Sequence, residues 1–280
     1  MSSDRITVAK LAALRPGQLA SILAGPADHA AAWIAAAAQN GIVEAQAVYG
    51  HLLLAGKGVS ADPVAALTWF KHAAQADHPL AMNMVGRCYE LGWGTACCFE
   101  VAVYWYRLAA RAGSDWGMYN YATALALGQG IGVDRAEALR WFERAAALGH
   151  AKSHNYIGSF YEDGWVDDGD GVVKAKDASN FTQARHHYRL AAEGGDFRGQ
   201  FNYARLLAEA DNLEEALLWI GKMQESATPA FLDKVRAMLT VSAHPVHRRL
   251  LQRIRHSSDG SAVFSPLDTH PLDVGTERQA

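Results

Sequence analysis

Apolar and small residues recur along this chain in blocks of about a dozen residues, with apolar positions three and four apart, as in amphipathic helices. Glycines or an Asp-Pro pair separate the blocks. The block that begins at Trp33 reads WIAAAAQNG, and related blocks begin at Trp69, Trp105 and Trp141, so that these four tryptophans follow one another at intervals of 36 residues. A fixed period of this size predicts an array of stacked helix pairs, in which each repeat packs only on its neighbours.

A second phrase precedes each tryptophan block, for example VGRCYELGWGT from Val85. It carries one small residue in its middle and is followed by a G-x-G turn in three copies, where glycine ends the helix because it tolerates a left-handed conformation. Asp62-Pro63 then predicts the start of the next helix. Each repeat is therefore expected to contain helix A, a glycine turn, helix B and a short turn. The small-residue column contains Gly50, Gly86, Ala122, Gly158 and Ala204.

The combined phrase A-x-x-W-[FY]-x-x-A-A-x-x-G, preceded by [YLVI]-G-x-x-[LY]-x-x-G-x-G, resembles the Sel1-like repeat family, a relative of the tetratricopeptide repeats. The resemblance covers residues 28–227. It implies an all-α fold, a right-handed α-solenoid of about five helix-turn-helix repeats with helical caps and a concave groove lined mainly by helix A. It also implies a scaffold or adaptor for protein complexes, and it brings no catalytic residues with it.

The chain outside the regular repeats suggests further segments. Residues 1–27 are expected to form N-terminal capping helices, residues 228–256 C-terminal capping helices, and residues 257–280 a flexible tail. The period is broken by an acidic insert, residues 164–180, which replaces the glycine turn of the fourth repeat. Its aspartates fit a calcium-binding loop poorly, so a solvated acidic loop is favoured, with a contact to a basic partner as the other possibility.

Two helix A columns, four residues apart on one face, vary from repeat to repeat and are therefore expected to face outward. Stacking would align them into a stripe of polar, aromatic and basic side chains, which are common at protein interfaces. The alternative is an ordinary solvated helix face. The predicted partner-binding residues are His51, Asn83, Arg87, Tyr119, Thr123, Asn155, Phe201 and Arg205.

Composition and charge argue against several classes of protein. With 26 Lys and Arg against 29 Asp and Glu, the net charge of −3 argues against nucleic acid as the main partner. No secretory signal is expected, because the first residues contain no long apolar run, and no apolar run in the sequence is long enough to span a membrane. Its three cysteines lie in one repeat and form no disulfide framework. These features indicate a cytoplasmic protein, and the alanine-rich repeats are typical of bacteria.

The leading hypothesis is a protein-interaction scaffold, adaptor or regulatory accessory subunit that binds a protein or extended peptide in its groove. One version is an accessory subunit of an enzyme from the same pathway. No P-loop, G-x-S-x-G or dinucleotide motif occurs, so no enzyme activity and no cofactor is expected. The alternative is a metal- or small-ligand-binding sensor that uses His150, His154 and the acidic insert. A structural protein that self-associates through its ends is the third hypothesis.

Overall fold

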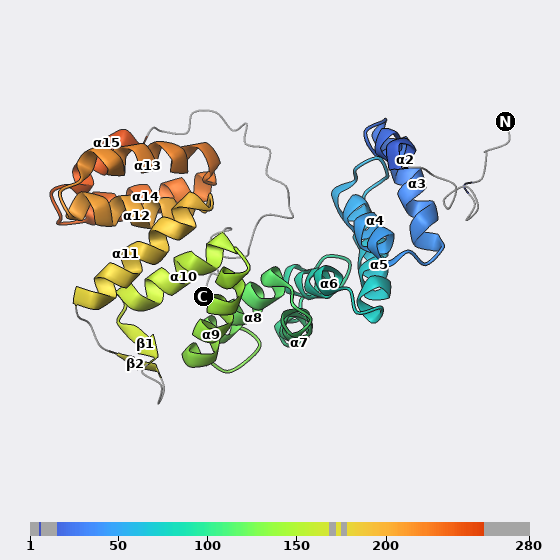
Figure 1. The fold of residues 1–280 in the computed structure, drawn as a ribbon, viewed down its shortest axis with the longest axis horizontal. Coiled ribbons are helices and arrows are strands. Elements are labelled where there is room, and N and C mark those ends of the chain that lie inside the picture. The colour runs from blue at the N-terminus through green and yellow to red at the C-terminus, as the bar shows by residue number, and fades with distance from the viewer. Residues whose placement is uncertain (1–5, 7–15, 168–171, 175–177, 255–280) are drawn as a thin grey trace. The chain divides into compact units, whose positions relative to one another are not determined.

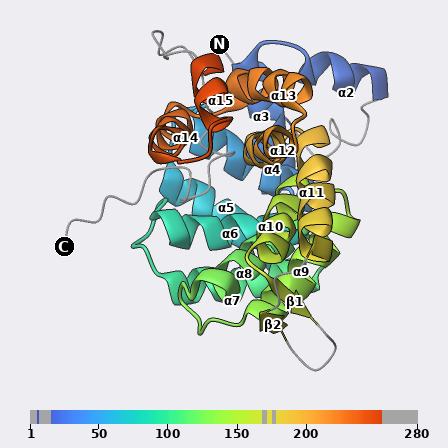
Figure 2. The same ribbon diagram turned by 90° about the vertical axis from the view of Figure 1, so that its left-hand side faces the viewer.

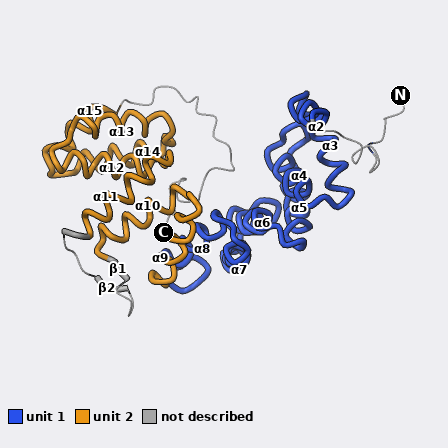
Figure 3. The backbone as a smooth tube through the Cα atoms, viewed as in Figure 1, with its two compact units in different colours: residues 1–133 blue, residues 134–280 orange. Residues whose placement is uncertain are grey.

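The computed structural model describes residue 6 and residues 16–167, 172–174 and 178–254. Its contacts divide the chain into two units, residues 1–133 and 134–280, shown in two colours in Figure 3. Each unit is built from helix pairs, so the predicted all-α repeat fold is confirmed.

The first unit contains successive helices in which each packs against the next (Figure 1). Helix A of one repeat also packs on helix A of the following one, since α6 contacts α8. The helices are α2 (Pro16–Leu23), α3 (Ala27–Gln39), α4 (Val43–Ala55), α5 (Pro63–Gln75), α6 (Pro79–Leu91), α7 (Phe99–Arg111) and α8 (Asp115–Leu127).

The second unit repeats this arrangement, with α10 packed on both α11 and α12, and ends in helices that lie in the segment expected to close the array. The helices are α9 (Arg135–Ala147), α10 (Ala151–Glu162), α11 (Ala178–Glu193), α12 (Phe197–Glu209), α13 (Leu213–Ser226), α14 (Pro229–Val241) and α15 (His247–Arg253).

The acidic insert contains a short antiparallel ribbon between α10 and α11, visible in Figure 2. Strand β1 (Trp165–Asp167) pairs with β2 (Val172–Lys174), and Val166 lies opposite Val173 in the register. The expectation of a loop throughout the insert is therefore wrong for these residues. Valines on both strands favour extended backbone. Residues 168–171 and 175–177 and the tail from residue 255 onward lie outside the described part of the chain.

The helix ends follow the predicted rules. Gly56, Gly92 and Gly128 cap α4, α6 and α8 with φ values of 65°, 72° and 72°. The Asp62 carboxylate accepts a hydrogen bond of 2.9 Å from the Ala65 backbone N–H at the start of α5. Local sequence therefore determines where helix A stops and helix B begins.

The second glycine of each G-x-G turn has a further role, in packing between repeats, which the sequence pattern did not predict. Gly58, Gly94 and Gly130 also have positive φ values, of 72°, 70° and 68°. A Cβ added to Gly94 would lie 2.2 Å from the Pro63 carbonyl oxygen. The same atom on Gly58 would lie 2.1 Å from the Ala27 oxygen. Each turn thus packs its backbone directly on the first turn of helix B in the preceding repeat.

The small-residue column lets helix A approach the aromatic side chain that follows the tryptophan position on helix B. A Cβ on Gly86 would come within 2.6 Å of the Tyr106 ring, and one on Gly158 within 2.7 Å of the Tyr188 ring. The prediction that this column faces the interior is confirmed, because all its members are buried. Close packing of this kind leaves no room for larger residues.

Two of these aromatic residues are tyrosines, and each is hydrogen-bonded to a glutamate of helix A. The Tyr106 hydroxyl donates to Glu90, and the Tyr188 hydroxyl donates to Glu162 over 2.8 Å. Burial raises the pKa of both Glu90 and Tyr106, even though the hydrogen bond from Tyr106 acts to lower the pKa of the carboxyl group. In the first repeat, where the aromatic residue is phenylalanine, the glutamate position holds leucine. The tyrosine and the glutamate thus occur together in a repeat or are both replaced.

This pairing predicts that Tyr106→Phe lowers the free energy of unfolding by about 1–3 kcal/mol, because the buried Glu90 carboxyl group would lose the hydrogen bond that the Tyr106 hydroxyl donates. Urea denaturation followed by circular dichroism measures the effect. The double variant Tyr106→Phe/Glu90→Leu reproduces the Phe70 and Leu54 pair of the first repeat and should recover part of the loss. A double variant less stable than Tyr106→Phe alone would contradict this account.

Candidate partner-binding surface

The predicted groove residues do not form an exposed stripe. His51 and Arg205 are partly buried, and the other six are fully buried. The prediction that these columns face solvent is therefore wrong for those six. Their exposed fractions are 5% for Asn83, 7% for Arg87, 1% for Tyr119, 1% for Thr123, 8% for Asn155 and 4% for Phe201.

Burial follows from the way helix A meets its equivalent in the next repeat. In the first unit the Asn120 side-chain amide donates to the Asn83 oxygen over 2.8 Å. In the second unit Asn202 donates to Asn155 over 2.9 Å, in the same two columns. These asparagines bond to each other across a repeat boundary. Variation from repeat to repeat is therefore not evidence of exposure in these columns.

The basic members of the stripe are also engaged within the fold. Arg205 Nη2 lies 2.6 Å and 2.7 Å from the two carboxylate oxygens of Glu162, and its Nη1 lies 3.2 Å from Glu209. Burial disfavours the charged guanidinium, but the two glutamates outweigh it and raise the pKa of Arg205. Arg87 places its guanidinium 5.1 Å from the centre of the Trp93 ring, within cation–π range. Trp93 thus contributes to packing of its own turn.

Two histidines have pKa values lowered to about 4. For His51 the causes are burial and the positive charges of Arg87 and His78, and its ring lies edge-on to Phe70 at 5.0 Å. For His187 they are burial and the neighbours His154 and His186. His187 Nδ1 lies 3.1 Å from His154 Nδ1. Both sites favour the neutral imidazole.

Acid should therefore destabilise the protein. Because the folded state holds His51 neutral down to a pH of about 4, while a free histidine takes up its proton near 6.5, the unfolded chain binds the proton first on acidification. The contribution of neutral His51 to the free energy of unfolding is fully present above pH 6.5 and is lost as the pH falls toward 4. A shift of this size corresponds to about 3 kcal/mol for a fully unfolded reference. His51→Gln should flatten the fall in unfolding free energy over this range.

The exposed His72 on α5 provides a matched control, since His72→Gln removes a histidine from the same repeat without altering the buried site. Its pH profile should follow that of the unchanged protein. If His51→Gln and His72→Gln gave the same profile, the burial of His51 would not be the cause of the acid sensitivity.

The predicted histidine ligands do not converge. His150 Nδ1 lies 3.0 Å from the Ser153 hydroxyl, while His154 pairs with His187. Within residues 16–167 and 178–254 no group of three or more His, Cys, Asp or Glu side chains is arranged around a possible metal position. Most of the aspartates considered for calcium lie outside the described residues or have no described side chain.

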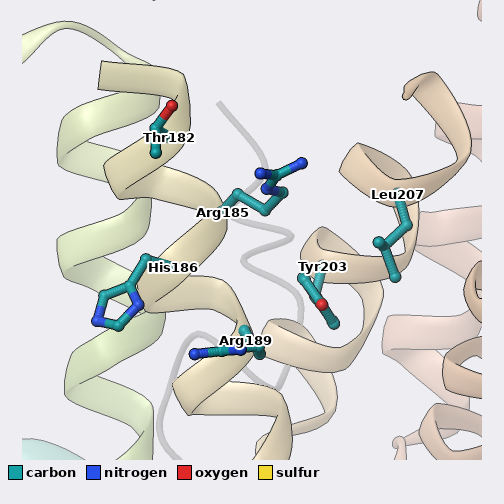
Figure 4. A pocket seen from close by; sticks show the side chains of 6 residues that line it. All are labelled: Thr182, Arg185, His186, Arg189, Tyr203 and Leu207. Atoms are coloured by element: carbon teal, nitrogen blue, oxygen red, sulfur yellow. The ribbon is translucent and has the colours of Figure 1, made fainter. Parts of the chain in front are cut away.

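A surface hollow not anticipated from the sequence lies between α11 and α12 (Figure 4). It has a volume of about 320 Å³. One wall of the hollow is helix B of the fourth repeat. The sequence had predicted a binding surface on helix A alone. The sequence signal for this hollow is the spacing of Arg185 and Arg189, which are four residues apart and therefore lie on one helix face. The structure shows that both are exposed. The lining residues are Thr182, Arg185, His186, Arg189, Tyr203 and Leu207.

None of the helices in the described part of the chain combines the length and hydrophobicity needed to cross a bilayer.

A comparison with curated proteins gave no match. Among solved structures, a Sel1 repeat protein from Oxalobacter formigenes is similar with a TM-score of 0.66 and 24% identity, over 84% of this chain and 94% of the other.

A second solved structure is c5321, a protective antigen of uropathogenic Escherichia coli with an SLR fold. It has a TM-score of 0.61 and 22% identity, and the match covers 85% of this chain. This chain spans about half the length of that antigen, since the match covers 51% of it. These two similarities support the fold.

The family model described as Sel1 repeat matches four consecutive segments, residues 43–78, 79–114, 117–150 and 151–196. The segments coincide with the helix pairs from α4/α5 to α10/α11 and cover more than half of the chain. The chain belongs to the Sel1 repeat family.

Proposed function

We propose that this protein is an interaction scaffold that binds another protein, or an extended segment of one, as an adaptor or accessory subunit. Sel1 repeat proteins are generally protein-interaction scaffolds, and solenoids of this family are typically non-catalytic. The observation that carries the proposal is the match of four consecutive repeats to this family.

The internal bonding of the repeats supports a preformed surface. Asn83 is already hydrogen-bonded to Asn120 in the unbound protein. Arg205 is likewise already paired with Glu162. A surface held in this way loses little conformational freedom on binding, so more of the contact energy appears as affinity. The eight residues of the predicted stripe then support the binding surface from beneath, and exposed side chains on the helices make the contacts.

The proposal is tested by cross-linking the tagged, full-length protein in its native cells and identifying what co-purifies. A partner present in a fixed ratio, recovered again when the partner itself is tagged, supports the scaffold function. Absence of any such partner in both directions would contradict it. Variants for mapping belong at exposed positions, because substitutions at Tyr119 or Thr123 would disturb the core.

A further inference from the structure

The hollow between α11 and α12 presents two guanidinium groups. Thr182, Arg185 and Arg189 recur at spacings of three and four along α11, and therefore share one helix face. Tyr203 and Leu207 form the opposite wall, one turn apart on α12. Figure 4 shows Arg185 extending from α11 toward the α12 side. The hollow thus combines positive charge with a hydroxyl-bearing and partly apolar wall.

Within the described part of the chain, the charge of the two arginines is poorly compensated. Among the described residues Arg189 forms one ion pair, with the Glu193 carboxylate at 3.8 Å, and both side chains are about half exposed at 48% and 52%. Such a pair contributes little and exchanges readily for another carboxylate. Within the described residues Arg185 forms no ion pair. The chain as a whole carries a net charge of −3, so this cationic site is a local exception.

A second hollow, of about 250 Å³, adjoins the first and shares Thr182 and Arg185 with it. Its walls include Phe181, whose residue surface is 49% exposed, and Leu206. The one carboxylate in its lining belongs to Glu209, which is already bonded to Arg205 and, over 2.9 Å, to His247. The two hollows therefore offer a cationic site beside a mainly apolar one.

We propose that these adjoining hollows bind an acidic segment of a partner protein. A carboxylate side chain lies against Arg185 and Arg189, and a nearby apolar side chain lies against Phe181 and Leu206. Arginine favours this occupant because its planar guanidinium binds a carboxylate through two parallel hydrogen bonds. The proposal rests on the scaffold function and specifies the chemistry of the bound segment.

The test uses a library of random linear peptides displayed on phage and selected on the immobilised full-length protein. The selected consensus peptide is then synthesised with a fluorescent label, and its affinity is measured by anisotropy. The expected consensus contains Asp or Glu close to an apolar residue. Its affinity should fall by about ten-fold or more in Arg185→Ala/Arg189→Ala, as for a charge pair at an interface.

The double variant Arg248→Ala/Arg249→Ala is the matched control, because it removes the same charge from exposed positions on α15. It should bind the peptide with unchanged affinity, and circular dichroism checks that both variants are folded. Selection of no peptide, of non-acidic peptides, or of a peptide that both variants bind equally well would overturn the proposal. Stronger binding of a single-stranded oligonucleotide at the same arginines would also overturn it. Co-purification of a partner decides the scaffold function independently of these outcomes.

Discussion

Gly94→Ala is expected to lower the free energy of unfolding by about 3 kcal/mol or more, from overpacking and left-handed strain together. The added Cβ would lie 2.2 Å from the Pro63 oxygen and 2.8 Å from the Val64 Cα. Both are backbone atoms of helix α5, which cannot move aside as a side chain would. The positive φ of 70° adds strain for any residue with a Cβ. Urea denaturation followed by circular dichroism measures the loss.

Gly92 in the same turn is the matched control. It also has a positive φ, of 72°, but the nearest atom to an added Cβ is the Thr95 oxygen at 3.5 Å, an ordinary contact. Gly92→Ala should therefore cost only the strain of the left-handed conformation, about 1 kcal/mol. Equal losses for the two variants would show that contact with the preceding repeat contributes nothing.

Arg205→Met is expected to lower the free energy of unfolding by about 2–3 kcal/mol, which is below the range for a fully buried ion pair. The side chains of Arg205 and Glu162 are 15% and 24% exposed, so water screens the pair only partly. Among the described residues, removing the guanidinium leaves the Tyr188 hydroxyl as the one side-chain donor to the Glu162 carboxylate. The loss should appear in the isolated protein, with no partner present.

A double-mutant cycle with Glu162→Gln isolates the pair. Because each single variant removes the same contact, the losses should not add, and the double variant should be more stable than their sum predicts. Arg189→Met provides the comparison for an exposed pair, with an expected loss of no more than about 1 kcal/mol. Additive losses at Arg205 and Glu162 would show that the two residues do not stabilise each other.

The repeat period and the helix ends could be predicted because they depend on local chemistry. A glycine at a left-handed cap, as at Gly92, or an aspartate at a helix start, as at Asp62, acts through its own few neighbours. Repetition then confirmed each local signal several times over. The β-ribbon of the insert could not be predicted in this way, because its sequence occurs only once in the chain.

The packing of the variable columns could not be predicted from one repeat at a time. Asn83 and Asn120 lie 37 residues apart, one period plus one residue, so their pairing becomes visible only when neighbouring repeats are compared. Tyr106 with Glu90 left a similar signal, because Phe70 and Leu54 replace both members together. A residue that varies between repeats can thus be buried if its partner varies with it.

The two kinds of buried polar pair have different consequences for recombination between repeats. The pair of Glu90 and Tyr106 lies within one repeat, so exchanging whole repeats would carry both members along and leave no orphan. The pair of Asn83 and Asn120 is divided between two repeats, so moving either repeat alone would separate the asparagines and leave a buried amide without its partner. Duplication of the repeat that contains Asn83 would therefore keep the pair of Glu90 and Tyr106 but would place one copy of Asn83 opposite a residue other than asparagine. A repeat boundary that contains such a pair therefore favours particular neighbouring repeats.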